Sequence, residues 1–216
     1  MSLTGTAAFD IGRVTDGELE SGTSILLTGD GDAIDAVFYR LIAPDDDERT
    51  VVLATDCDGR TIKRDLDGID RGLGDQASVL TCAGVSRDDD ITAIEDISDL
   101  TKAGMEFSTL LAEAQQETDR FRAGINLCSS ILAEVDDTRS VYRFLNSNFL
   151  TELRRGDGIG VCAIDTSADI GANIDSIIKG LETSFDGRID VEDAAGATTI
   201  EISGLGDVDG TVELRR

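Results

Sequence analysis

The sequence predicts an α/β protein in which helices cover both faces of a mainly parallel central sheet. Two observations support this prediction. Short apolar runs alternate along the chain with segments of helical period, which is the pattern of repeated strand–helix units. The last part of the chain instead alternates single apolar and polar residues, as antiparallel strands do. For 216 residues, 40% of them hydrophobic, we expect one domain over 1–216, with a lead-in over 1–20 and antiparallel strands over 185–216.

Five apolar runs predict strands that are buried on both faces. Such runs lack a polar face, as expected for the strands of a parallel sheet. They are SILLTG at 24–29, TVVLAT at 50–55, SVLTC at 78–82, INLCS at 125–129 and GIGVCAID at 158–165.

Four segments with apolar residues at helical spacing predict the helices. The first ends before Pro44, because proline cannot continue a helix, and the third has Asp137 as its expected N-cap. The apolar positions are Ile34, Val37, Phe38, Leu41 and Ile42; Phe107, Leu110, Leu111 and Ala114; Val141, Leu145, Phe149 and Leu153; and Ile170, Ile174, Ile177, Ile178 and Leu181.

After Phe185 the period changes to two. RIDVED at 188–193, TTIEISG at 198–204 and GTVELRR at 210–216 alternate apolar and polar residues between turns that contain glycine. We expect these strands to form an antiparallel meander at the edge of the sheet.

The charge of the chain is strongly negative along its whole length. Its 44 acidic residues exceed its 19 basic ones by 25, and only three of the basic residues are lysines. This composition is typical of extreme halophiles, in which a Debye length of about 3 Å at molar salt screens the self-repulsion. The sequence has no basic stripe, so direct nucleic-acid binding is not expected.

The sequence predicts a cytoplasmic protein that does not bind membranes. No run approaches 18 consecutive apolar residues, and the first residues lack a basic segment followed by an apolar one. The four cysteines show no C-x-x-C spacing, and free thiols fit this compartment.

Residues 24–36, SILLTGDGDAIDA, have the outline of a phosphate-binding strand, loop and helix. A P-loop follows G-x-x-x-x-G-K-[ST], and of that pattern only Gly29 is present. Counting from Gly29, the second glycine falls on Ile34, the lysine on Asp35 and the hydroxyl residue on Ala36. The three acids of the segment, Asp30, Asp32 and Asp35, would repel a nucleotide.

Two interpretations of this segment remain open. It is a disabled nucleotide site, or it is a strand, a Gly29-Asp30-Gly31 turn and a helix that never bound phosphate. In either case we expect Asp30 and Asp32 to act as the cap and a first-turn acid of the helix.

The order of segments resembles a RecA-like domain, specifically the KaiC-like group of archaeal ATPases. The similarity covers roughly residues 20–216 and is specific in order and spacing. It comprises LESGTSILLTGDGDA before the helix, TVVLATDCDGRTI, DLTKAGMEFSTLL at 99–111, the Walker B-like stretch that begins with INLCSSILAEV, and SFDGRIDVED with TTIEISGL.

The resemblance implies a three-layer RecA-like fold, but the catalytic residues of the family are mostly absent. Asp35 and Ala36 replace the P-loop Lys and Ser/Thr. The Walker B aspartate corresponds to Cys128, and the next residue, Ser129, cannot replace a carboxylate as a ligand of Mg²⁺. Asp56 and Asp58 remain near the positions of the water-activating acids. The resemblance therefore implies no catalytic residues, no cofactor and no ATP hydrolysis, with weak binding of ATP and Mg²⁺ as the alternative.

Two further groups of residues are candidates for chemistry. Cys57, Cys82, Cys128 and Cys162 each lie near the end of a predicted strand, so a Cys-based metal or redox site is a third hypothesis, although cysteine also suits buried strand interiors without any chemistry, which is the preferred interpretation. Histidine is absent, which excludes Ser-His-Asp catalysis and His-ligated zinc. Four arginines form the second group, and Tyr142 and Phe144 lie beside them. In a RecA-like ring they could reach the nucleotide of an adjacent subunit, or they could pair with surface acids. They are Arg139, Arg143, Arg154 and Arg155.

The sequence thus predicts a non-catalytic RecA/KaiC-like domain that acts as a regulatory or signalling interaction module. The expected partner is a protein, either an intact KaiC-like ATPase or a second copy of the chain. A weak ATP-binding switch or residual ATPase is the alternative function.

Overall fold

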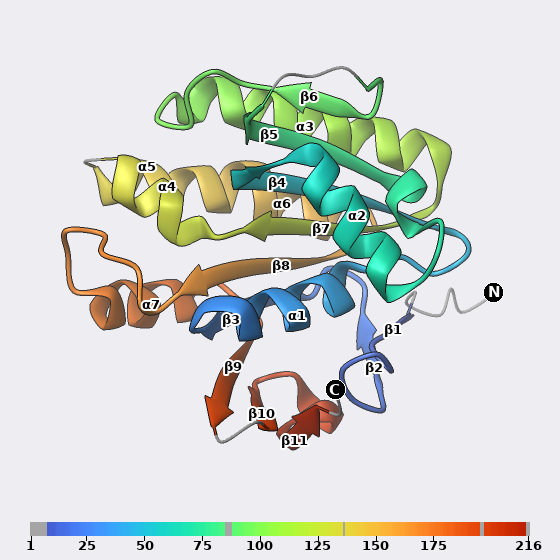
Figure 1. The fold of residues 1–216 in the computed structure, drawn as a ribbon, viewed down its shortest axis with the longest axis vertical. Helices are drawn as coiled ribbons and strands as arrows, with labels where there is room; N and C mark the ends of the chain where they lie inside the picture. Colours follow the sequence, from blue (N-terminus) through green and yellow to red (C-terminus); the bar gives the residue numbers. More distant parts are fainter. Residues whose placement is uncertain (1–7, 85–87, 136, 195–196, 215–216) are drawn as a thin grey trace.

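The computed structural model describes residues 8–84, 88–135, 137–194 and 197–214, without the side chains of Asp32 and Ala194. Within these residues the core is a nine-stranded sheet in the order β11-β10-β9-β3-β8-β7-β4-β5-β6 (Figure 1). The strands are β3 (Ser24–Gly29), β4 (Glu48–Asp58), β5 (Ala77–Ala83), β6 (Ile91–Ala93), β7 (Arg120–Asn126), β8 (Gly158–Asp165), β9 (Gly187–Ala194), β10 (Ala197–Ser203) and β11 (Gly210–Leu214).

The sheet is parallel from β6 to β9, and β10 and β11 continue it in antiparallel pairing. The predicted α/β fold, with a parallel core and a C-terminal antiparallel hairpin, is therefore confirmed. The first strand of the tail, β9, pairs parallel with β3, so the antiparallel part starts at β10. Asp186, the residue before β9, links that strand to the start of β3. Its carboxylate accepts hydrogen bonds from the Ser24 backbone N–H at 2.9 Å and the Ser24 hydroxyl at 2.5 Å.

Helices cover both faces of the sheet (Figure 1). Two of them, α1 (Gly31–Ile42) and α2 (Gly59–Ile69), lie on one face. The opposite layer contains α3 (Leu100–Glu117), α4 (Cys128–Glu134), α5 (Thr138–Phe144), a π-helical segment (Leu145–Leu150), α6 (Thr151–Arg155) and α7 (Ile174–Glu182). The remaining elements are a two-stranded sheet of β1 (Ala8–Asp10) and β2 (Glu18–Glu20) and the 3₁₀ turns Leu73–Gln76 and Gly206–Val208.

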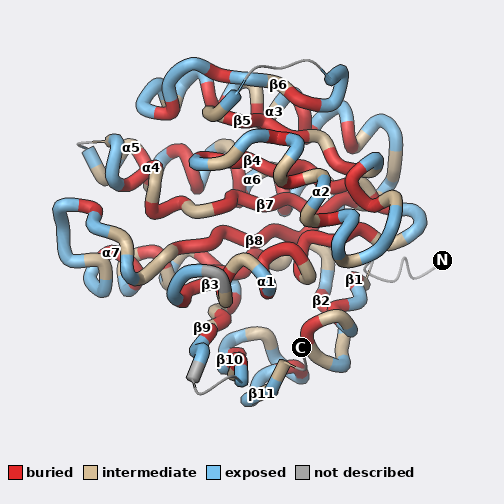
Figure 2. Tube along the Cα trace, viewed as in Figure 1, coloured by how far each residue is buried: buried red, intermediate tan, exposed pale blue. Residues whose placement is uncertain are grey.

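A separate apolar cluster fills the space on each side of the sheet. Alternate residues of β3 divide between them, since Leu26 points into the cluster under α3 to α7, and Ile25 and Leu27 point into the cluster under α1 and α2. Figure 2 shows the buried strands in red between partly exposed helices. Each fully buried aliphatic or aromatic side chain contributes about 1.5–3 kcal/mol, so these clusters are the main source of stability.

A buried ion pair fixes the start of β7. Arg122 and Glu48 have side chains that are each 1% exposed, and Arg122 Nε lies 2.5 Å from Glu48 Oε2. The remaining Arg122 donors bind the backbone carbonyl oxygens of Leu41 and Asp10, both at 2.9 Å. The guanidinium of Arg120 stacks on the Phe9 ring at 4.4 Å. This network ties β4, β7, α1 and the β1 hairpin together.

Several boundaries differ from those predicted. β7 spans 120–126, whereas the prediction was 125–129, so Cys128 begins α4 and does not lie in a strand. Ile170 is buried but precedes α7, which begins at Ile174 with Asn173 as its N-cap. The elements not predicted from the sequence are α2, α4, β1, β2 and β6.

The predicted third helix contains a wider turn. Its apolar residues recur at every fourth position, and all four are at most 1% exposed; they are Val141, Leu145, Phe149 and Leu153. A regular helix of 3.6 residues per turn would rotate such a series off one face, and the π-helical segment at Leu145–Leu150 keeps it on the core side. The predicted cap is confirmed, since the Asp137 carboxylate accepts a hydrogen bond from the backbone N–H of Arg139 at 3.1 Å.

No helix in the described part of the chain is both long and apolar enough to cross a membrane.

Candidate functional site

The candidate site lies where the parallel strands end. β3, β8, β7, β4 and β5 run side by side in one direction, so the loops that follow them share one edge of the sheet (Figure 1). In open α/β sheets ligands bind at this edge. All of the predicted site residues are on β3, β4 or β7 or in the segments that follow these strands.

The connection between β3 and α1 consists of one residue, Asp30. In a P-loop the residues between the two glycines form a loop whose N–H groups surround the phosphate. Here β3 ends at Gly29 and α1 begins at Gly31, so the positions of that loop already belong to the first turn of the helix. The connection therefore has no loop long enough to surround a phosphate.

The two glycines of this connection have conformational and packing roles. A Cβ on Gly29 would lie 2.7 Å from the Val191 carbonyl oxygen and 2.9 Å from Val191 Cβ, so the glycine permits close pairing of β3 with β9. Gly31 has a φ of 52°, in the left-handed region that favours glycine. Neither role requires a bound phosphate.

Asp30 occupies the N-cap position of α1, as predicted, but its carboxylate does not cap the helix. It accepts a hydrogen bond from the Thr166 hydroxyl, at the end of β8. The Thr166 backbone N–H also donates to the Gly29 carbonyl at 2.9 Å. Asp35 is half-buried and Ala36 exposed further along α1, while the side chain of Asp32 lies outside the described residues.

The turn after β7 has an unusual backbone conformation. The strand ends at Asn126, which is 2% exposed, and Leu127 has a φ of 56°, which is rare for a residue other than glycine. The Thr55 hydroxyl lies 2.7 Å from the Asn126 carbonyl and 3.0 Å from that of Leu127, and so holds the turn in place. Left-handed residues of this kind cost about 1–3 kcal/mol and are frequent at functional sites.

The structure places the two predicted Walker B positions behind this turn. Cys128 is fully buried at the start of α4, and the Ser129 hydroxyl accepts a hydrogen bond from the Asp165 backbone N–H at 3.2 Å. Asn126, two residues before Cys128, is the last residue of β7. Its amide can donate and accept hydrogen bonds, but it provides no negative charge for a cation.

Asp56 and Asp58 have different surroundings at the end of β4. Asp56 is exposed, but partial desolvation at the strand end raises its pKa, and the nearby Asp165 carboxylate raises it further, while a backbone hydrogen bond opposes the shift. The Asp58 carboxylate caps α2 by accepting from the backbone N–H groups of Arg60 at 2.9 Å and Thr61 at 3.0 Å. Asp58 thus has a structural role, and Asp56 faces a second acid.

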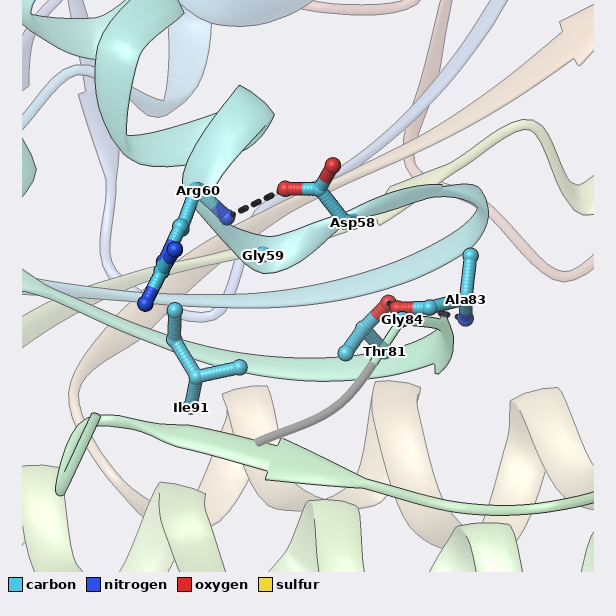
Figure 3. A pocket seen from close by; sticks show the side chains of 7 residues that line it. All are labelled: Asp58, Gly59, Arg60, Thr81, Ala83, Gly84 and Ile91. Carbon is cyan, nitrogen blue, oxygen red and sulfur yellow. Dashed lines mark hydrogen bonds between the residues drawn. The ribbon is translucent and has the colours of Figure 1, made fainter. Parts of the chain in front are cut away.

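A cavity of about 260 Å³ adjoins Asp58 at the ends of β4 and β5 (Figure 3). Asp58 and Arg60 lie on its α2 side, and Thr81 and Ile91 lie on the side of β5 and β6. Arg60 Nε is 3.7 Å from the Asp88 carboxylate in a pair that is mostly exposed. Asp58 already accepts the N–H groups of Arg60 and Thr61 in the first turn of α2, so these two donors are not available to an anion in this cavity.

The four cysteines do not converge on one point. Cys57 packs against the cluster under α1 and α2, and the other three pack on the opposite face of the sheet. Cys128 and Cys162 contact one another there, and burial together with this contact raises the pKa of Cys162. Burial and the neighbouring acids raise the pKa of Cys57 to about 12, and burial raises that of Cys82 to about 11. Among the described residues, no group of three or more His, Cys, Asp or Glu side chains is placed to hold a metal ion.

The predicted arginine cluster divides into two pairs. Arg154 and Arg155 are on α6, which leads into the start of β8, and they lie near Asp186 at 3.9 Å and Glu152 at 3.6 Å. Arg139 and Arg143 are exposed on α5, which follows the end of β7. The two pairs are therefore at opposite ends of the helical layer.

Sequence reasoning missed Asn126, Leu127, Asp165 and Thr166. Asp165 and Thr166 were detectable, because they follow a strongly apolar strand whose end was predicted correctly. Asn126 and Leu127 could not be recognised as the end of a strand and the turn after it, because the sequence placed that strand at 125–129 and not at 120–126.

Two solved structures define the class of the fold as KaiC-like and RecA-type. A KaiC-like protein from the hyperthermophilic archaeon Pyrococcus horikoshii matches with a TM-score of 0.58 and 13% sequence identity, over 96% of this chain and 93% of that chain. An uncharacterized protein of Pyrococcus horikoshii, in complex with an unknown peptide, matches with a TM-score of 0.66 and 13% identity, over 93% and 90%. At this identity the similarity concerns the fold alone.

The chain belongs to DUF7504, a family of unknown function whose model matches residues 22–191. No curated protein matches the chain.

Proposed function

We propose that this chain is a non-catalytic KaiC-like domain that works by binding another protein, as a regulatory or signalling module in the cytoplasm of a halophilic archaeon. The observation that supports the proposal most strongly is the single-residue connection between β3 and α1. Where an active site would have a phosphate-binding loop with Lys and Ser/Thr, the chain has one residue, followed on α1 by Asp35 and Ala36. A domain that does not hydrolyse ATP needs neither these residues nor a loop that holds phosphate, and the short connection supports that proposal.

The electrostatics of the strand ends also favour this proposal. Asp30, Asp56 and Asp165 all lie at this edge, and Asp165 raises the pKa of Asp56. In a nucleotide site the triphosphate would add negative charge to these carboxylates without a lysine to offset it. A protein ligand needs no such compensation, and one of the two structural neighbours is a complex with a peptide.

The second candidate function is a weak ATP-binding switch. The N-terminus of α1 has no side-chain cap, which leaves its first N–H groups available for an anion. Calorimetry with ATP and Mg²⁺ in molar KCl separates the two functions. Our proposal predicts no saturable heat and no shift in the melting temperature, whereas a saturable heat that is lost when Gly31 is replaced would establish the switch.

A protein partner is the positive expectation, and it is tested by capture on the immobilised full chain in molar KCl. We expect a stoichiometric partner, either a KaiC-like ATPase or a second copy of the chain. Failure to retain any protein at native salt, together with ATP binding, would contradict the proposal.

A further inference from the structure

One surface groove combines apolar side chains with unpaired positive charge on a chain that is otherwise strongly acidic. We call it the α3–α5 groove. It has a volume of about 410 Å³ and lies between the N-terminal end of α3 and the face formed by α5 and the π-helical segment. Its lining residues are Ser98, Asp99, Leu100, Thr101, Met105, Val135, Ser140, Arg143, Phe144, Ser147 and Asn148.

The apolar part of the groove is unusual for this surface. Met105 is 67% exposed, and it is the one large hydrophobic side chain exposed to this degree among the described residues. Leu100 and Val135, both half-buried, extend the apolar surface beside it, and Phe144, which is 3% exposed, forms its base. Methionine is frequent at binding surfaces because its flexible, polarisable side chain adapts to different partners.

The positive charge of the groove has no ion-pair partner among the residues that the structure describes. Within the described residues Arg143 forms no ion pair, and neither does Arg139, one helical turn before it on the same face of α5. Most arginines elsewhere are paired, as the 44 acids of the chain would lead us to expect. The Asp99 carboxylate, the acid of the groove, is engaged by the backbone N–H of Lys102 at 3.0 Å.

The helices that form the groove are held closely together at its base. A Cβ on Gly104 would lie 2.7 Å from the Asn148 side chain, so glycine permits α3 to approach the π-helical segment. The Asn148 amide in turn lies 3.4 Å from the Ser108 hydroxyl. The groove is therefore a feature of packed helices, and π-helical turns are frequent at functional sites.

We propose that the α3–α5 groove binds an extended acidic segment of a partner protein, in which an apolar residue adjoins an Asp or Glu. The apolar residue packs on Met105 and Leu100, and the carboxylate pairs with Arg143. This inference rests on the proposed function and names the surface through which the module binds. At molar salt, where charges interact over only about 3 Å, the carboxylate must contact the guanidinium directly, so apolar contact provides most of the affinity.

The test is a selection of peptides from a random display library on the full chain in molar KCl. We expect the recovered peptides to contain Leu, Ile, Met or Phe next to Asp or Glu. Their affinities are then measured by fluorescence anisotropy with synthetic labelled peptides. Met105→Ser should weaken binding about tenfold or more, and Arg143→Ala about two- to fivefold.

Arg71→Ala is the matched control, because Arg71 is also exposed and unpaired but lies after α2, far from the groove in sequence. It should leave the affinity unchanged, and circular dichroism should show that all variants fold. The inference would be overturned if the recovered peptides contained no acidic residues, or if no peptides were enriched. It would also be overturned if Met105→Ser left the peptide affinity unchanged. A dimer that dissociates on Met105→Ser would also overturn it, because the occupant would then be a second copy.

The groove and the proposed function can fail separately. Partner capture by the full chain that persists in Met105→Ser and Arg143→Ala would refute the groove and leave the function intact. ATP turnover would refute the proposed function whatever the peptides show.

Discussion

At the scale of single residues, the glycine that ends β3 can be tested by giving it a side chain. Gly29→Ala places a Cβ 2.7 Å from a backbone oxygen of β9, which cannot rotate away. We expect a loss of about 1–3 kcal/mol in the free energy of unfolding, measured by urea denaturation in molar KCl. Gly68→Ala is the control: this glycine lies inside α2 with open space around it, and alanine there should add about 0.5–1 kcal/mol. Equal stability of Gly29→Ala and the parent would contradict the packing role.

Asp56 provides a pH-dependent prediction. Its pKa is raised in the folded state, mainly by partial desolvation and also by the Asp165 carboxylate, so the folded protein binds a proton more tightly than the unfolded chain. Stability therefore falls as pH rises from the ordinary carboxyl pKa through the raised one, and Asp56→Asn should remove this fall and stabilise the protein at neutral pH.

The measurement is the Asp56 carboxyl titration by NMR, together with unfolding at several pH values in molar KCl. Because Asp56 is exposed, molar salt should screen the contribution of Asp165, and only the part of the shift due to partial desolvation should remain. Asp165→Asn removes the neighbouring charge and should lower the pKa of Asp56. A titration at the ordinary carboxyl pKa in the parent would show that the side chain is hydrated.

At the scale of elements, the buried Arg122–Glu48 pair joins β7 to β4. Arg122→Met leaves Glu48 buried with only Arg120 beside it, at 2.8 Å. We expect destabilisation by about 3–5 kcal/mol, with little dependence on salt. Arg60→Met, which removes an exposed pair with Asp88, should cost less than about 1 kcal/mol in the same urea titration. If Arg122→Met and Arg60→Met lowered the free energy of unfolding by similar amounts, the buried pair would contribute no more to stability than the exposed one.

The same ion pair explains why one strand was misplaced in the sequence analysis. β7 reads RFRAGIN, and two arginines argue against a buried strand until their partners Glu48 and Phe9 are known. The runs at 24–29 and 158–165 needed no such partners, and the structure has β3 and β8 at those bounds. α2 was missed because only Gly59, Ile62 and Leu66 are buried in it, too few to produce a helical pattern.

The candidate site was predictable in position but not in geometry. Counting residues located Asp35 and Ala36, because a motif is linear. The early start of α1 depends on the close packing of Gly29 against Val191 and on the Thr166 hydrogen bond to Asp30, which join segments far apart in the sequence. Such long-range contacts have no local signal.

At the scale of the whole molecule, the net charge of −25 predicts dependence on salt. Self-repulsion at ~0.1 M KCl, with a Debye length of about 10 Å, should destabilise the fold, and molar KCl should restore it. We expect the melting temperature to rise steeply over this range. An uncharged stabiliser such as sucrose at matched osmolality is the control, and it should have a much smaller effect. A melting temperature independent of KCl would contradict the halophilic interpretation.

The proposal that this KaiC-like domain does not turn over ATP is tested most directly by phosphate release from ATP in molar KCl with Mg²⁺. We predict a rate equal to that of buffer alone, for the parent and for Asp56→Asn alike. A rate above buffer that is lost in Asp56→Asn would contradict the proposal, because it would place a working catalytic acid at the end of β4.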